Sequence, residues 1–161
     1  MKRAANSLNS HGVQLSSNQV QMSLISLAPL RNGFIETCNE IGVTPISYSP
    51  LGLGLLTGKY DASNLPPGPR GLLFRSLLPG LSPLIATMKE IGRGKGKTCG
   101  QVALNWAICK GTVPIVGAKN VQQAKENLGA VGWRLDASEI EEIERIAFRA
   151  KIQGQQNIFQ N

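Results

Sequence analysis

The chain has 161 residues, 42% of them hydrophobic and 17% charged, with a formal net charge of +7. This composition is typical of a globular protein, and no apolar run reaches the ~18 residues of a membrane span. Aromatic residues are few and basic residues are scattered, which disfavours a nucleic-acid partner. The basic start of the chain leads into polar residues, so it does not read as a signal peptide. We expect a soluble intracellular protein with neither nucleic acid nor membrane as a partner.

The length of the chain and its cysteines limit the size of the fold and the kind of compartment that we expect. A chain of this length suits one domain, or a little over half of a closed (β/α)8 barrel, which takes about 250 residues. The three cysteines, Cys38, Cys99 and Cys109, are odd in number and lack CxxC spacing. We expect them to be reduced thiols, as in an intracellular protein.

The first half of the chain predicts strands that alternate with helices. Alternation around Val20 and Met22 at 18–23, and a short apolar and β-branched run at 43–48, predict strands. Helices are expected over 2–10 and 33–41. Residues 61–80 are rich in proline and glycine, and this composition predicts a loop.

The second half is mainly helical. From Leu81 onward, apolar residues at helical spacing predict a helix that is capped by Ser82 and ended by the glycines at 92–96. Two capping boxes predict two further helices: Thr98 with Gln101, and Asp136 with Glu139.

Between those two helices the sequence predicts one more strand and one more helix. Residues 113–116 predict a buried strand. Asn120 is placed to cap a helix whose Val121 and Leu128 are expected to face inward. The Gln/Asn-rich residues 151–161 are expected to form a flexible tail on a domain of residues 1–150.

Strands alternating with helices predict an α/β fold with a parallel sheet. Three strands cannot close into a barrel, so the sheet edges would present unpaired N–H and C=O groups. We therefore expect the chain to self-associate through this open edge.

The segment 44–60 organises the rest of the chain, because a strand runs there into a glycine-rich loop that ends at Lys59. Exposed backbone N–H groups beside an ammonium group suit an anion such as a phosphate. The spacing is that of neither a Walker A loop nor the dinucleotide fingerprint, since Thr57 fills the third glycine position of the latter. An ordinary strand and loop with no ligand is the alternative.

Three segments resemble, in order, the last three strands of the aldo-keto reductases: SNQVQMSL at 17–24, YSPLGLGLLTGKY at 48–60, and IVGAKN at 115–120 with Glu126 and Asn127 following. The resemblance covers nearly the whole chain and is greatest to the plant plastid branch. It implies a partial (β/α)8 TIM barrel, roughly strands six to eight with their helices.

The resemblance also implies a site for NADP(H). The matching glutamine of the family holds the nicotinamide carboxamide, the matching aromatic residue stacks on the nicotinamide, and the residues that follow lie along the diphosphate. The implied residues for these three parts are Gln19, then Tyr48, then Ser49, Pro50, Leu51 and Gly52.

The adenosine side of the cofactor is implied at the other segments. Basic residues flank the phosphates, and the last strand leads into a helix N-terminus that suits the 2′-phosphate, which favours NADP over NAD. These residues are Lys59, Arg70, Gly117, Lys119, Gln123, Glu126 and Asn127, the last two matching adenine-binding positions.

The catalytic tyrosine, lysine, aspartate and histidine of the family come from the first half of the barrel, and we identify no catalytic residue here. The resemblance implies the NADP(H)-binding portion of an enzyme that reduces a small aldehyde or ketone by hydride transfer, inactive alone. The alternatives are a non-catalytic NADP-binding or interaction module, and a truncated gene product without function. The plastid branch makes the chloroplast stroma the expected compartment, with the cytoplasm as the alternative.

Overall fold

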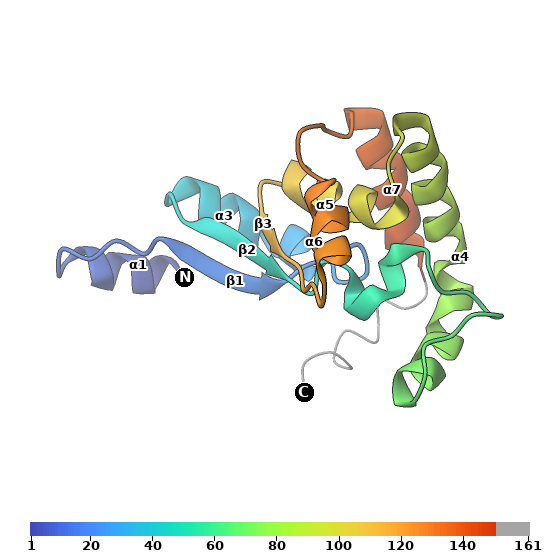
Figure 1. Ribbon diagram of the computed structural model, residues 1–161. Coiled ribbons are helices and arrows are strands. Elements are labelled where there is room, and N and C mark those ends of the chain that lie inside the picture. Colours follow the sequence, from blue (N-terminus) through green and yellow to red (C-terminus); the bar gives the residue numbers. More distant parts are fainter. Residues whose placement is uncertain (151–161) are drawn as a thin grey trace.

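The structure is a computed structural model, and it describes residues 1–150 (Figure 1). Its sheet has three parallel strands in the order β1-β2-β3, formed by Ser17–Gln21, Thr44–Tyr48 and Val113–Ile115. The predicted α/β class and parallel sheet are confirmed. The predicted tail at 151–161 lies outside the described residues.

One helix precedes the first strand, and the others lie between and after the strands. Before β2 come α1 (Lys2–Asn9), α2 (Ala28–Arg31) and α3 (Phe34–Glu40). After β2 come the 3-10 helix η1 (Gly52–Thr57), α4 (Pro69–Lys95) and α5 (Cys99–Cys109), and β3 is followed by α6 (Val121–Leu128) and α7 (Ala137–Arg149). Both predicted capping boxes are formed, at the starts of α5 and α7.

The hydrophobic core lies beside the sheet, among α4, α5, α7 and the segment that follows β1 (Figure 1). Trp106 is its largest fully buried residue, and its indole N–H donates to Glu144 over 2.9 Å. The same carboxylate pairs with Lys110 at 2.8 Å. The buried indole therefore keeps its hydrogen bond, and α5 is tied to α7 by a polar contact as well as by packing.

The prediction of a loop over 61–80 is wrong from Pro69 onward. Helix α4 begins at that residue and runs through Pro79 and Pro83. Ser82 is thus inside the helix and does not cap it. Phe74, Leu77 and Leu81 continue the apolar stripe of α4 toward its start, and all three are buried. An interior proline costs a helix about 3 kcal/mol, and here burial of this stripe offsets that cost.

Helix α4 has the length and hydropathy of a membrane-spanning helix, the only such helix in residues 1–150. Its Leu81, Leu84 and Met88 are completely buried in the core. The apolar character of α4 is therefore explained by its packing against α5 and α7.

Two predictions of burial are also wrong. Strand β3 is exposed at both ends, with Val113 and Ile115 at 50% and 45% exposure. On α6, Val121 and Leu128 are 71% and 66% exposed. The side of α6 that meets α5 is polar, since Gln101 there donates to the carbonyl of Glu126 over 2.9 Å.

The sheet is covered on one face only. Alternate residues of β2, Pro45 and Ser47, are buried on the side of α3 and α5, where the Ser47 hydroxyl lies 3.0 Å from that of Thr112. The strand register places the other residues on the opposite face, where Gln19, Val113 and Ile115 are exposed and Gln21, Ile46 and Tyr48 are half-buried. We call it the open face; it comprises Ser17, Gln19, Gln21, Thr44, Ile46, Tyr48, Val113 and Ile115.

The open face is polar along β1 and mainly apolar along β2 and β3. Exposure of this apolar part to water is unfavourable. We predict that the isolated chain self-associates through this part. Replacing Val113 and Ile115 together by threonine keeps the β propensity and removes exposed apolar surface. Sedimentation velocity should then show a shift toward monomer.

The matched control is the double replacement of Val121 and Leu128 by glutamine. It removes a similar exposed apolar area from α6, away from the open face. Association that is unchanged by the strand variant, or a monodisperse monomer for the unaltered chain, would contradict the prediction.

Candidate functional site

A groove of about 690 Å³ lies at the carboxyl ends of β2 and β3, walled by η1 and the starts of α4, α5 and α6. In α/β folds this end of the strands is where ligands bind. Ten of the thirteen predicted site residues line it: Ser49, Pro50, Leu51, Lys59, Arg70, Gly117, Lys119, Gln123, Glu126 and Asn127.

The other three predicted residues do not line the groove. Gly52 is buried beneath it, where a side chain would collide with Ile25. Gln19 and Tyr48 lie on the open face of the sheet, with Gln19 exposed and Tyr48 half-buried. Because Tyr48 directly precedes Ser49, the open face and the groove meet at the end of β2.

The backbone after β2 turns sharply to form the floor of the groove. Ser49 and Leu53 adopt positive φ angles of 52° and 56°, which few residues other than glycine tolerate. The Gly52 N–H donates to the Ser49 carbonyl over 2.9 Å, and the Gly54 N–H donates to the Leu51 carbonyl over 3.0 Å. The positive φ angles of Gly52 and Gly54 are therefore shared by two other residues of this loop.

Arg70, in the first turn of α4, is held in place by aromatic rings. Its guanidinium lies 5.7 Å from the ring centroids of both Tyr60 and Phe74, and it donates to the Tyr60 hydroxyl over 3.3 Å. The two rings meet edge to face with their centroids 5.2 Å apart. Cation–π contacts of this kind restrain a long side chain without neutralising its charge. The role of Tyr60 was not predicted, because proximity across ten residues of loop leaves no pattern in the sequence.

At the other wall, α6 starts beside Lys119. Asn120 caps the helix as predicted and accepts the N–H of Gln123 over 2.9 Å. The Gln123 side chain in turn accepts the N–H of Lys119 over 2.7 Å. The backbone N–H groups of Lys119 and Gln123 therefore donate to side chains and are not free to bind an anion. The Lys119 ammonium is the principal group that an anion can contact there.

Glu126 is the acidic residue that lines the groove. Its carboxylate accepts a 2.6 Å hydrogen bond from the hydroxyl of Thr98, and its carbonyl accepts from the Gln101 side chain. Next to it, the Asn127 amide donates to the Gly117 carbonyl over 3.4 Å. The residues of α5 in this network were predicted as a helix cap, and nothing in their spacing pointed to α6.

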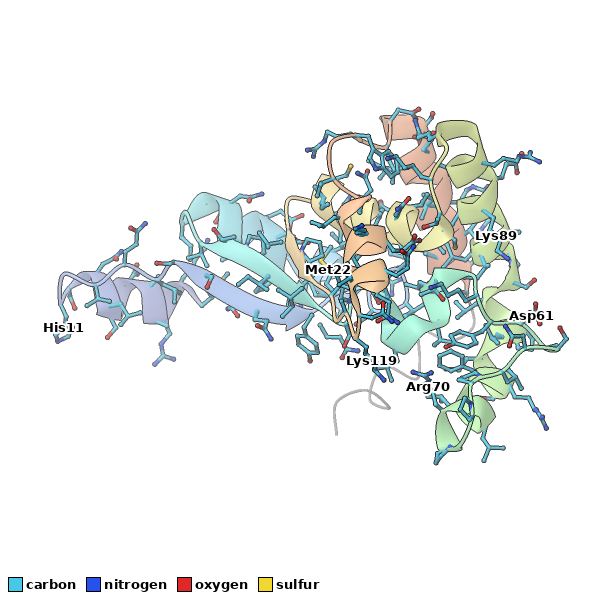
Figure 2. The ribbon with its side chains drawn as sticks, viewed as in Figure 1. His11, Met22, Asp61, Arg70, Lys89 and Lys119 are labelled. Carbon is cyan, nitrogen blue, oxygen red and sulfur yellow. The ribbon has the colours of Figure 1, made fainter. Side chains whose placement is uncertain are left out.

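The electrostatics of the groove favour an anion. Lys59, Arg70 and Lys119 line it, and none of them forms a salt bridge within residues 1–150. Figure 2 shows Arg70 and Lys119 at the same lower edge of the molecule, from α4 and from the segment before α6. Three unpaired cations against the single Glu126 carboxylate leave the lining positive, which suits phosphate groups.

His11 and Cys99 both lie outside the lining of the groove. His11 lies in the turn after α1, where its Nδ1 is 2.8 Å from the Ser7 carbonyl. Cys99 is buried at the start of α5, and burial raises the pKa of its thiol to about 11. The thiol therefore stays protonated at neutral pH and is a poor nucleophile. All three cysteines are free, as predicted.

Comparison with known sequences shows what the chain is similar to. Residues 1–147 match the model of the Aldo/keto reductase family. The chain is 52% identical over 153 residues to the chloroplastic pyridoxal reductase of Arabidopsis thaliana, which covers 95% of this chain and 42% of that protein. It is 34% identical over 134 residues to the aldo-keto reductase str7 of Strobilurus tenacellus, covering 76% of this chain and 39% of that protein.

Solved structures give the same result for the fold. A thermostable aldo-keto reductase in complex with the inhibitor epalrestat matches with a TM-score of 0.61 at 26% identity, over 81% of this chain and 39% of that one. The glycerol dehydrogenase of Gluconobacter oxydans matches with a TM-score of 0.64 at 18% identity, over 84% of this chain and 43% of that one. The chain therefore spans about two fifths of the length of these relatives, as the predicted partial barrel requires.

The floor of the groove gives a prediction about stability. Replacing Gly52 by alanine forces a side chain into a positive φ of 53° and against Ile25. We expect a loss of about 1–3 kcal/mol in the free energy of unfolding. Chemical denaturation followed by tryptophan fluorescence measures it.

Gly94 in α4 is the matched control, because a side chain there meets nothing within 4 Å. Its replacement by alanine should stabilise the protein by up to about 1 kcal/mol. Equal effects of the two replacements would mean that the conformation at Gly52 is not required.

Proposed function

Because the chain belongs to the aldo/keto reductase family, we propose that it is the NADP(H)-binding part of an aldo-keto reductase-type oxidoreductase. NADPH supplies the hydride in that chemistry, and a small aldehyde or ketone receives it. In this proposal the chain binds the cofactor, and the groups that protonate the carbonyl come from a part of the fold that these residues do not include.

The observation that carries the proposal is the positive groove at the carboxyl ends of β2 and β3. It is long enough to be lined both by the turn after β2 and by the first two turns of α6. Its cations stand at separate places along it: Lys59 and Arg70 beside η1, and Lys119 before α6. A dinucleotide with phosphates at its centre and on its ribose needs positive charge at two such places.

The residues fit the parts of this cofactor unequally. Ser49, Pro50 and Leu51 would lie along the diphosphate, and Lys119 would bind the 2′-phosphate. Glu126 and Asn127 would face the adenine. The nicotinamide would lie beyond the groove, over the open face, where Gln19 and Tyr48 are on the same side of the sheet.

The relatives refine the proposal. The name of the Arabidopsis protein makes pyridoxal, an aldehyde, the proposed substrate of a complete enzyme of this kind, and the chloroplast its proposed compartment. A solved structure with NADPH bound, matching with a TM-score of 0.60 at 19% identity, supports the fold on which the proposal rests.

A first test concerns the 2′-phosphate. Replacing Lys119 by alanine removes a charge-assisted contact of about 1.5–3 kcal/mol, equivalent to roughly ten- to 150-fold in affinity. NADPH binding should weaken by this factor, and NADH binding, which lacks the phosphate, should stay nearly unchanged. Quenching of the fluorescence of Trp106 and Trp133 gives the two dissociation constants.

Replacing Lys125 by alanine is the control for net charge. Lys125 is exposed on α6, does not line the groove and forms no salt bridge among the described residues. Equal losses of NADPH and NADH binding in the Lys119 variant would show that this lysine only adds to the general field. Binding of neither cofactor by the unaltered chain would favour an interaction module or a chain without function.

A second test concerns activity. General acid catalysis contributes about 10²–10⁴ in rate and needs an acid within hydrogen-bond reach of the carbonyl. We expect the isolated chain to show no NADPH-dependent reduction of pyridoxal or 4-nitrobenzaldehyde above background. The Arabidopsis relative assayed beside it is the positive control, and turnover by the chain at a comparable rate would refute this part of the proposal.

A further inference from the structure

The first turn of α5 is bonded to α6 through one residue, Glu126. The Thr98 hydroxyl accepts the N–H of Gln101 over 3.3 Å and lies 2.6 Å from Oε1 of Glu126. A carboxylate can only accept, so the hydroxyl proton must point to Glu126. A hydrogen bond this short to an ionised acceptor is of the strong, charge-assisted kind.

Gln101 makes the second link. Its Oε1 accepts the N–H of Thr98 over 3.0 Å, and its Nε2 donates to the carbonyl of Glu126 over 2.9 Å. Both ends of the amide are therefore used, and its orientation is determined by the bonds themselves. Gly129 at the end of α6 lies so close that a side chain there would overlap this amide. The side chain of Gln101 is thus clamped between the two helices.

These links leave Glu126 with one free acceptor. Its Oε1 and its carbonyl are engaged from α5, whereas its Oε2 has no hydrogen bond or ion pair among the described residues. Glu126 lines the groove and is half-buried. An ionised carboxylate oxygen held at a groove wall binds a ligand that brings a donor, and an exocyclic amine is such a group.

We propose that Thr98 and Gln101 are positioning residues, which orient the Glu126 carboxylate so that the groove selects a purine with a 6-amino group. The inference rests on the proposed function and adds to it the residues that set base selectivity. Thr98 lies outside the groove lining and acts through the carboxylate of Glu126, whereas Gln101 lines the groove and acts on Glu126 through the Glu126 carbonyl.

The test compares NADPH with its hypoxanthine analogue, which has a 6-keto group in place of the amine. The unaltered chain should bind NADPH about ten-fold more tightly than the analogue. Replacing Thr98 by aspartate keeps a strong N-cap acceptor for Gln101 but sets a carboxylate against that of Glu126. In that variant we expect NADPH affinity to fall about ten-fold and the preference for adenine to disappear.

Two further variants separate positioning from a general structural effect. Thr98→Ser keeps the hydroxyl and should restore both affinity and preference. Gln101→Glu keeps the capping box, since its carboxylate still accepts the Thr98 N–H, but it loses the donor to the Glu126 carbonyl. It should weaken the adenine preference in a chain that still unfolds cooperatively, and it provides the test if the aspartate variant does not fold.

The outcomes are distinguishable. A lost preference in folded Thr98→Asp and Gln101→Glu, with rescue by Thr98→Ser, would support the inference. A folded Thr98→Asp variant that keeps the preference, or NADPH binding by the unaltered chain with no preference, would overturn the inference alone. Failure of the unaltered chain to bind NADPH would overturn the proposed function and the inference with it.

Discussion

The pairing of β2 with both of its neighbours is the constraint on which the rest of the structure depends. Parallel pairing on both sides brings the carboxyl ends of all three strands to one edge, and therefore brings the loops after β2 and β3 together there. The same register assigns alternate residues to the helix-covered face and to the open face. The groove and the open face are thus two results of one hydrogen-bonding pattern, and they meet where β2 ends.

The elements that depend on local chemistry could be predicted from the sequence. Capping boxes at Thr98 and Asp136, and strands bounded by glycine or proline, involve neighbours within a few residues, so their spacing is visible. Helix α4 was the exception. Its prolines oppose a helix locally, and only the burial of the stripe that starts at Phe74 outweighs them. The exposure of Val113 and Val121 was missed for a related reason, because hydrophobicity predicts burial only where a partner surface exists.

For the site, the resemblance gave the residues, and the fold brought ten of them to one groove. Strand-end logic alone reaches those that closely follow a strand, such as Ser49 after β2 and Gly117 after β3. It could not find Tyr60, which braces Arg70 across a loop, or Thr98 and Gln101, which reach Glu126 from another helix. Contacts between elements that are 10 to 28 residues apart leave no periodicity behind. It also could not show that the backbone N–H groups of Lys119 and Gln123 donate to side chains.

The prolines of α4 have a further consequence for shape. A straight helix of 27 residues is about 40 Å long, and a rod of that length touches a rounded core only near its middle. Pro79 and Pro83 are both exposed and stand one turn apart, so the backbone carbonyls they leave unpaired can be solvated. Proline on the outer side favours a bend that is convex toward solvent. Such curvature lets one continuous helix follow the core from Phe74 to Met88 and still present Arg70 at the groove.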